Sequence, residues 1–446
     1  MTNYRSKIVI LFIGLAISSC LVVQNQFLGL APGPWRAVLK LEFVPVTPNP
    51  KGKPLPEKLN LEFEEVSKGE LPFTFEVIYK DDSKEDFHIE IINGEERIIV
   101  DDVIVGRDLK TAKDTILIDF PVYDSYIKAI YEENIMEGEW IVRNRDNYSI
   151  PFVARHGQDH RFTTLRKEPK LDLTGKWETT FEIGTEDEYK AIGEFQQNGN
   201  KLTGTFLTET GDYRFLEGTV QENKMYLSVF DGSHAFLFEA KITEEETLIG
   251  SFRSGTHYRT TWEAKRNPDF KLKDEGELTF LNEGYDKVNF SFPNTKGEMV
   301  SLDDDRYQGK VKIVNIFGTW CPNCRDEAKF LKEYLDTHPN NDLEVISLAF
   351  EKRKTEEEAF AAIERFRTNL GVNYEILYAG YYNKKQAAEA LPMLNHILSY
   401  PTMIIIDKND QVRRIHTGFS GPATSKYATF KEEFDTLVQE ILREPI

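Results

Sequence analysis

The stretch KVKIVNIFGTWCPNCRDE, from Lys310 to Glu327, decides the fold of the C-terminal part of this chain. Its first half is an apolar run of the kind that forms a strand buried in a sheet. Its second half reads as a helix, because Pro322 suits the first helical position and Ala328, Leu331 and Leu335 recur at helical spacing. The stretch therefore predicts a strand, a short loop and a helix, with a CxxC pair at the start of the helix.

The two cysteines of this motif, Cys321 and Cys324, differ in their expected environment. Cys321 would face the unpaired N–H groups and the positive dipole end of the helix, which stabilise a thiolate. Cys324, three residues on, would lie on the same helix face one turn deeper. We therefore expect Cys321 to be the nucleophile and Cys324 to resolve the mixed disulfide that it forms.

Other uses of a CxxC motif fit this sequence less well. A structural zinc site needs four ligands, and the chain has 3 cysteines and 8 scattered histidines. Haem attachment requires a histidine directly after Cys324, where Arg325 stands. A purely structural disulfide across so short a loop would add little stability, and the helix N-terminus would make it labile. We expect no metal and no cofactor beyond a redox-active Cys321–Cys324 disulfide.

The elements that follow alternate between strand and helix, which indicates an α/β layer around a central sheet. Thr355 with Glu358 forms a capping box at the start of one helix. The expected elements are a strand at 343–350, helices at 355–367 and 384–398, the strands TMIIID and QVRRIHTG, and an amphipathic helix at 425–443.

Together with FSFPNTKGEMVSLDD upstream and YPTMIIIDKNDQVRRIHTGF downstream, the 310–327 stretch resembles the TlpA/ResA family of envelope thiol–disulfide oxidoreductases. These are thioredoxin-like proteins related to the AhpC/TSA redoxins. The resemblance runs from about Phe290 to the C-terminus and implies a thioredoxin-like domain over 277–446. More loosely, the chain is similar to Bacteroidetes-type envelope proteins that carry β-rich modules before such a domain.

The resemblance also implies roles for individual residues. Pro401 matches the proline that is cis and packs beside the disulfide in the thioredoxin fold, and Trp320 matches the aromatic residue beside the nucleophile. The residues expected to contact a client are Trp320, Pro322, Tyr400, Pro401 and Thr402.

Glu327 matches the acidic residue three positions after the second cysteine of the family motif. A helix brings it to the face of Cys324, where it would accept or donate the proton of the buried thiol. The alternative is an ordinary first-turn carboxylate favoured by the helix dipole. Two positions depart from common patterns: Asn315 stands where cytosolic thioredoxins have a buried aspartate, and Ala328 stands where many relatives have a proline.

The N-terminus carries an export signal. Arg5 and Lys7 precede an apolar run, and the tetrad ending at Cys20 resembles the lipobox of bacterial lipoproteins. Because the apolar run continues to Val23, an uncleaved anchor is an alternative, and a plain cleaved signal is a third. All three place the rest of the chain outside the cytoplasm, on the periplasmic side of the cell envelope, with the first two attaching it to a membrane.

Between this signal and the thioredoxin-like domain we expect mostly β structure. Prolines predict a tether over 24–60, and short Val-, Ile- and Phe-rich runs predict a β-rich domain over 61–168. Alternating residues with tight turns predict a small antiparallel barrel or sandwich over 171–267, in which KLTGTF is echoed by TLIGSF. The polar-aromatic clusters at 211–215 and 230–234 are expected to be turns, with a ligand pocket as the alternative. The fold class is therefore multidomain α+β, with N-terminal antiparallel β domains and a C-terminal α/β domain.

Composition narrows the function. Length predicts about three domains, and a net charge of −19 gives no electrostatic footprint for nucleic acid. The main hypothesis is a membrane-tethered reductase that exchanges disulfides with exported protein clients.

The family resemblance implies regeneration of this reductase by a membrane donor of the CcdA/DsbD type. The alternatives are a peroxiredoxin-like peroxidase and a non-enzymatic binding lipoprotein whose β domains do the work.

Overall fold

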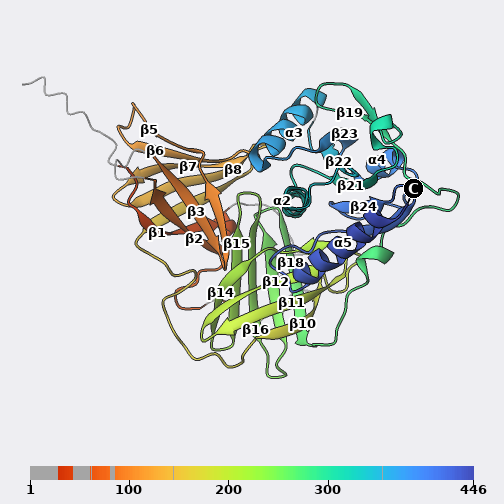
Figure 1. Cartoon of the computed structure of the whole chain (residues 1–446). Helices are drawn as coiled ribbons and strands as arrows, with labels where there is room; N and C mark the ends of the chain where they lie inside the picture. The colour runs from red at the N-terminus through yellow and green to blue at the C-terminus, as the bar shows by residue number, and fades with distance from the viewer. Residues whose placement is uncertain are drawn as a thin grey trace, which may run out of the picture.

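The computed structural model describes residues 29–43, 61, 63–80, 86–143, 145–353 and 355–445. They form an N-terminal sheet, a barrel and a C-terminal α/β domain, which meet around the start of one helix (Figure 1). The predicted fold class is confirmed. Cys20 and the segment 1–23 lie outside the described residues, and within the described ranges no helix is both long and apolar enough to span a membrane.

The N-terminal sheet is entirely antiparallel and has the order β4-β3-β2-β1-β9-β8-β7-β6-β5. Its strands are β1 (Gly33–Lys40), β2 (Glu70–Tyr79), β3 (Phe87–Asn93), β4 (Glu96–Val100), β5 (Val103–Arg107), β6 (Asp114–Phe120), β7 (Ser125–Glu132), β8 (Ile135–Val142) and β9 (Ser149–His156). β3 and β4 form a tight hairpin that turns at Gly94, directly after Asn93.

The predicted tether over 24–60 is wrong for its described part. Gly33–Lys40 forms β1 in the middle of the sheet, and the short 3-10 helix η1 (Leu41–Phe43) follows it. The flanking prolines dominated the sequence pattern. Within the strand, however, Trp35, Ala37 and Leu39 alternate and are fully buried, which is the pattern of a strand with one face on a core.

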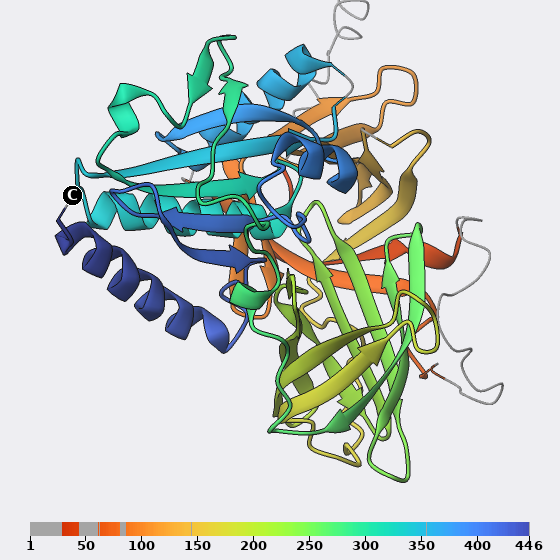
Figure 2. The ribbon, with the colours of Figure 1, turned by 90° about the vertical axis from the view of Figure 1, so that its right-hand side faces the viewer.

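The second unit is a closed antiparallel barrel, the first of the two predicted forms. The barrel strands are β10 (Gly175–Phe181), β11 (Tyr189–Asn198), β12 (Lys201–Thr208), β13 (Gly211–Asp212), β14 (Leu216–Gln221), β15 (Lys224–Phe230), β16 (Ala235–Ile242), β17 (Leu248–Ser254) and β18 (Tyr258–Arg266). β10 pairs with both β11 and β18, and β11 pairs with β12, which closes the ring (Figure 2).

The two echoes KLTGTF and TLIGSF form β12 and β17, and their glycines lie where strands approach closely. A Cβ atom at Gly204 would overlap the backbone oxygen of Glu194, and one at Gly250 would overlap that of Glu239. The repeat therefore marks two equivalent close approaches within the barrel wall.

Barrel residues of β15 and β16 complete the hydrophobic core of the sheet, while the barrel interior forms a core of its own. Phe230 of β15 is fully buried and stacks on Phe73 of β2 with ring centroids 4.4 Å apart. Trp140 of the sheet meets the same ring edge-on at 5.3 Å. Beside this core, the buried Arg161 guanidinium donates to the side chain of Asn93, and to the backbone oxygen of Ser228 in the barrel. The two β units are thus packed as one body.

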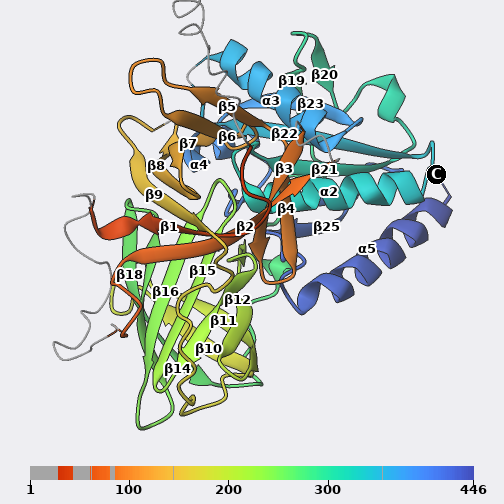
Figure 3. The ribbon, with the colours of Figure 1, turned by 90° about the vertical axis from the view of Figure 1, so that its left-hand side faces the viewer.

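The C-terminal domain has a five-stranded sheet of order β23-β22-β21-β24-β25. In it β21, β22 and β23 are parallel, β24 runs antiparallel to β21, and β25 runs antiparallel to β24. Its elements are η2 (Glu275–Glu277), β19 (Ser291–Pro293), β20 (Met299–Ser301), η3 (Asp305–Tyr307), β21 (Val311–Phe317), α2 (Pro322–Thr337), β22 (Leu343–Glu351), α3 (Glu356–Leu370), β23 (Glu375–Tyr381), α4 (Lys384–Ala390), β24 (Thr402–Ile406), β25 (Val412–Thr417) and α5 (Lys426–Arg443). β19 and β20 form a separate two-stranded antiparallel sheet. Helices α2 and α5 pack together through Phe330 and Phe434, whose rings lie 4.9 Å apart (Figure 3).

Most predicted elements of this domain are present within a few residues. The Thr355 cap is confirmed, since its side chain accepts from the Glu358 N–H. The helix predicted over 384–398 is wrong in its second half, because α4 ends at Ala390. Pro392 explains the difference, since a proline disfavours helical backbone at the residue before it and lacks the N–H that a continuing helix needs.

Candidate active site

The CxxC motif lies at the predicted junction between β21 and α2. Cys321 is the N-cap residue of α2, and its Sγ accepts the backbone N–H of Cys324 at 3.3 Å. The Cys321 thiol also lies 3.4 Å from the backbone oxygen of Tyr400, to which it donates. Both cysteines are present as free thiols. Cys321 is 7% exposed and Cys324 is 0% exposed, so an incoming disulfide meets Cys321 first.

The loop before Cys321 is held from the neighbouring strand β22. The Glu351 carboxylate accepts the N–H and the hydroxyl of Thr319, each at 2.8 Å. The Trp320 indole donates to the backbone oxygen of Phe350 at 2.9 Å. Burial raises the pKa of Glu351, and the two Thr319 hydrogen bonds oppose that rise. Sequence reasoning missed Glu351, because a carboxylate at the end of an apolar strand carries no motif.

Cys324 and Glu327 lie on helix α2 after Cys321, and both side chains are completely buried. Burial raises the pKa of the Cys324 thiol well above its usual value, and interaction with Cys321 raises it further. Burial, followed by the charge of Cys321, raises the pKa of the Glu327 carboxyl group well above its usual value, while Asn315 acts in the opposite direction. Glu327 is 0% exposed. Its environment is therefore a buried pocket beside the thiols rather than the surface of a first helical turn.

Four of the five residues expected to contact a client form a rim around Cys321: Trp320, Pro322, Tyr400 and Pro401. All of them except Trp320 are buried. The Tyr400–Pro401 peptide bond is cis, as the resemblance implied. The rings of Trp320 and Tyr400 lie 5.6 Å apart. Thr402 is fully buried and donates to the backbone oxygen of Ser399, so it supports the loop and does not face a client.

A turn of the barrel lies against this rim, which the sequence did not predict. Gly211 forms a parallel bridge with Phe419, and the Ser399 hydroxyl donates to the backbone oxygen of Thr210 at 3.1 Å. A Cβ atom at Gly211 would overlap the side-chain amide of Asn323, inside the CxxC motif. The 211–215 cluster is therefore not a simple turn, since Gly211–Asp212 forms the short strand β13, and it packs against the active-site helix.

Arg214, in the same turn region, joins all three parts of the chain. Its guanidinium pairs with Asp326 of α2, with Glu96 of β4 at 2.6 Å and with Asp231 of the barrel at 3.7 Å. Burial lowers the pKa of Arg214, but the carboxylates, led by Glu96, raise it above its usual value overall. Figure 3 shows β4 close to α2, where this cluster lies. Because the ion cluster is buried, it fixes the orientation of the β domains on the active-site helix.

In the described part of the chain, no three His, Cys, Asp or Glu side chains are grouped as a metal site would require. The chemistry available at this site is that of the two thiols and the carboxyl group beside them. A thioredoxin-type fold with a CxxC at a helix N-terminus and a cis-proline loop beside it defines a dithiol–disulfide exchange protein.

Comparison with known proteins gives the family. Residues 284–415 match the AhpC/TSA family. The thioredoxin-like protein YneN of Bacillus subtilis is 30% identical over 145 residues, which cover 31% of this chain and 73% of the relative. The thiol-disulfide oxidoreductase ResA of Geobacillus kaustophilus is 29% identical over 142 residues, covering 32% and 73%. A crystal structure of a thioredoxin-family thiol:disulfide interchange protein from Chlorobium tepidum shares 21% identity and covers 36% of this chain and 98% of that chain, with a TM-score of 0.28. This chain belongs to the TlpA/ResA-like family of thiol–disulfide oxidoreductases.

Proposed function

We propose that this protein is an envelope reductase that removes disulfides from exported protein clients while tethered to a membrane. The observation that carries the proposal is the asymmetry of the two thiols. Cys321 lies at the N-cap of α2 and is the outer sulfur, whereas Cys324 is completely buried and has a raised pKa. In such a pair, the outer thiol attacks the client disulfide, and the buried thiol stays protonated until the mixed disulfide has formed.

The reaction has two exchange steps. The Cys321 thiolate attacks one sulfur of the client disulfide, which breaks the client S–S bond, forms a mixed disulfide and releases one client thiolate. Cys324 then loses its proton and attacks the Cys321 sulfur, which releases the second client thiolate. The two leaving thiolates take up protons. Two electrons pass from the protein to the client, and the protein ends with a Cys321–Cys324 disulfide.

Glu327 is proposed to accept the proton of the Cys324 thiol in the second step. Cys324 is buried and its thiol has a raised pKa, so it needs a nearby acceptor before it becomes a nucleophile. Glu327 is a buried carboxyl group that interacts electrostatically with both thiols. Trp320, Pro322, Tyr400 and Pro401 are proposed to contact the client around the mixed disulfide, with Thr402 supporting them from below.

The direction of transfer and the location are part of the proposal and rest on the family resemblance and the N-terminal signal. A membrane donor of the CcdA/DsbD type would return the dithiol after each cycle. Cys20 would carry the lipid, or the apolar segment around it would remain as an anchor. Extraction of membrane fractions with detergent, before and after Cys20→Ala, tests the tether.

Trapping tests the exchange itself. In cells that express the full chain, Cys324→Ala should accumulate mixed disulfides between Cys321 and envelope clients, because the resolving thiol is absent. Cys321→Ser is the matched control and should trap nothing. If Cys324→Ala also yields no mixed disulfide with any envelope protein, exchange with protein clients is wrong.

A peroxidase is the second candidate, and the match of residues 284–415 to the AhpC/TSA family favours keeping it. Cys321 would then attack hydrogen peroxide, forming a sulfenic acid and releasing water, and Cys324 would condense with it to a disulfide with loss of a second water. Consumption of hydrogen peroxide by the reduced full chain, faster than its reduction of a disulfide peptide, would favour this reaction over the first. The third reading, a binding lipoprotein, predicts that Cys321→Ser leaves the cellular role intact.

A further inference from the structure

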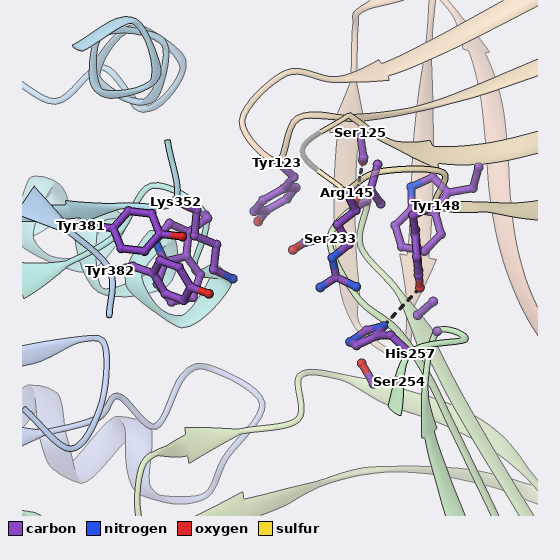
Figure 4. A pocket seen from close by; sticks show the side chains of 16 residues that line it. Tyr123, Ser125, Arg145, Tyr148, Ser233, Ser254, His257, Lys352, Tyr381 and Tyr382 are labelled. Atoms are coloured by element: carbon purple, nitrogen blue, oxygen red, sulfur yellow. Dashed lines mark hydrogen bonds between the residues drawn. The ribbon is translucent and has the colours of Figure 1, made fainter. Parts of the chain in front are cut away.

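A cavity of about 260 Å³ lies beside the nucleophile, and all three parts of the chain line it (Figure 4). The α/β domain contributes Trp320, Lys352 and Tyr382, the N-terminal sheet contributes Tyr148, and the barrel contributes His257. Trp320 directly precedes Cys321 in the chain. The Cys321 sulfur also interacts electrostatically with Lys352 in the cavity wall. A client residue next to a disulfide bound at Cys321 would therefore reach this cavity, whose volume suits one or two side chains rather than a folded segment.

Two cations enter the cavity from opposite walls. Lys352 follows β22, and its Nζ lies 3.7 Å from the centre of the Trp320 ring and 5.1 Å from that of Tyr382. Arg145 follows β8, and its guanidinium carbon lies 5.0 Å from the centre of the Tyr148 ring. Figure 4 shows Lys352 and Arg145 on the two sides of the same space. Burial, followed by the positive charge of Arg145, lowers the pKa of Lys352, so the two side chains repel each other electrostatically.

No carboxylate of the described residues forms an ion pair with Lys352 or Arg145. The groups that interact electrostatically with Lys352 are Arg145, the Cys321 sulfur and the Glu351 carboxyl group. The Glu351 carboxyl group already accepts two hydrogen bonds from Thr319. His257, which lies 3.2 Å from the Tyr148 hydroxyl, adds no charge at neutral pH, because burial and the nearby cations lower its pKa to about 4. In a chain of net charge −19, two cations left without carboxylate partners at one cavity need a separate explanation.

We propose that this cavity binds a carboxylate of the disulfide client, held between Lys352 and Arg145, which the Trp320 and Tyr148 rings position. An anion is the ligand that relieves the repulsion between the two cations, and charge-assisted hydrogen bonds to it are the strong kind. The inference rests on the proposed function and narrows its substrate class to disulfides with an acidic neighbour. The carboxylate belongs either to an acidic segment of a protein or to a small thiol compound such as glutathione.

A binding experiment tests the site without any redox step. The reduced full chain is titrated, by ligand-observed NMR, with a short peptide in which glutamates flank an S-methylcysteine, and with the same peptide carrying glutamines. S-methylglutathione and its diester form a second pair. The site is expected to recognise one of these two pairs, the peptides or the glutathione compounds. In that pair, the acidic probe should bind about tenfold more tightly than its neutral counterpart. Arg145→Gln and Lys352→Gln should each remove most of that preference.

The control is Lys110→Gln, which removes the same charge from the exposed β5–β6 turn and should leave the preference unchanged. A kinetic arm compares kcat/KM for the corresponding acidic and neutral disulfides. The ratio is the readout, because a general effect of Lys352 on Cys321 reactivity cancels in it. Arg145→Gln should bring the ratio close to one.

Each outcome decides a different point. Preference for the glutamate peptide assigns the site to acidic protein segments, and preference for S-methylglutathione assigns it to a small thiol. Equal binding of acidic and neutral probes, or an unchanged preference in both variants, overturns the assignment. If the acidic probes bind as expected but no disulfide is reduced, the proposed function is wrong while the carboxylate site stands.

Discussion

Replacing Glu327 with glutamine is expected to stabilise the folded chain as the pH rises while it slows the reaction. Burial, followed by the charge of Cys321, raises the pKa of the Glu327 carboxyl group well above the ordinary value of 4.5. Between those two values the folded chain binds more protons at this site than the unfolded chain. Wild-type stability therefore falls as the pH rises through that interval, by about 1.4 kcal/mol per pH unit. Glutamine does not titrate and escapes this loss.

Urea unfolding of the reduced full chain measures the effect. Across the first units above pH 4.5, the free energy of unfolding of Glu327→Gln minus that of the wild type should increase by about 1.4 kcal/mol per unit. Glu333→Gln is the matched control, since Glu333 lies on the same helix but is exposed. That control should stay within about 0.5 kcal/mol of the wild type at every pH.

The same variant should resolve mixed disulfides slowly. Losing a positioned proton acceptor costs at least about a hundredfold in rate, so rapid-mixing measurements should show normal formation of the mixed disulfide and delayed release of the client. A stability difference that does not change with pH would refute the argument, because the carboxyl would then titrate in the folded chain as it does in the unfolded one.

Three further predictions concern the arrangement of the domains and the cavity. Arg214→Met should lower the free energy of unfolding by about 3 kcal/mol or more, because it leaves Asp326 and its neighbours as buried unpaired charges; denaturant unfolding checks this. Phe230→Ala should cost about 3 to 5 kcal/mol, and calorimetry should show the sheet and the barrel destabilised together, because both pack on that ring. Burial lowers the pKa of Lys352 to about 8, so the kcat/KM preference for acidic over neutral disulfides should decline as the pH passes that value and the lysine loses its charge.

The elements around the CxxC motif were predictable because their signals are local. An apolar strand, a proline at the first helical position and a cysteine at the N-cap specify the β21–α2 junction within a few residues. Helical spacing places Glu327 on the face of Cys324, but it leaves open whether the carboxyl group is buried, which the structure shows. Strand β1 is hard to predict because the prolines around it outweigh its short alternating pattern. The end of α4 depends on Pro392, which interrupts an otherwise helical pattern.

The contacts between domains were not predictable from these patterns. Arg214 and Asp326 are 112 positions apart, and no local sequence pattern around either residue indicates that the two form an ion pair. Lys352 and Arg145 each look like an ordinary charged residue after a strand. Their common cavity exists only because the sheet, the barrel and the α/β domain are packed together. Such sites depend on tertiary placement, which single-sequence periodicity does not encode.

This placement bears on what the β domains do. A spacer that only lifts the redox site from a membrane would need no fixed orientation relative to α2. Here, a buried ion cluster fixes that orientation, a barrel turn packs on Asn323, and Cys321 is left 7% exposed. A client of the proposed reaction would approach the thiol past surfaces that the β domains supply. Specificity would then arise from the β domains as much as from the CxxC motif, because the same dithiol chemistry is reached through a cavity with its own charge and shape.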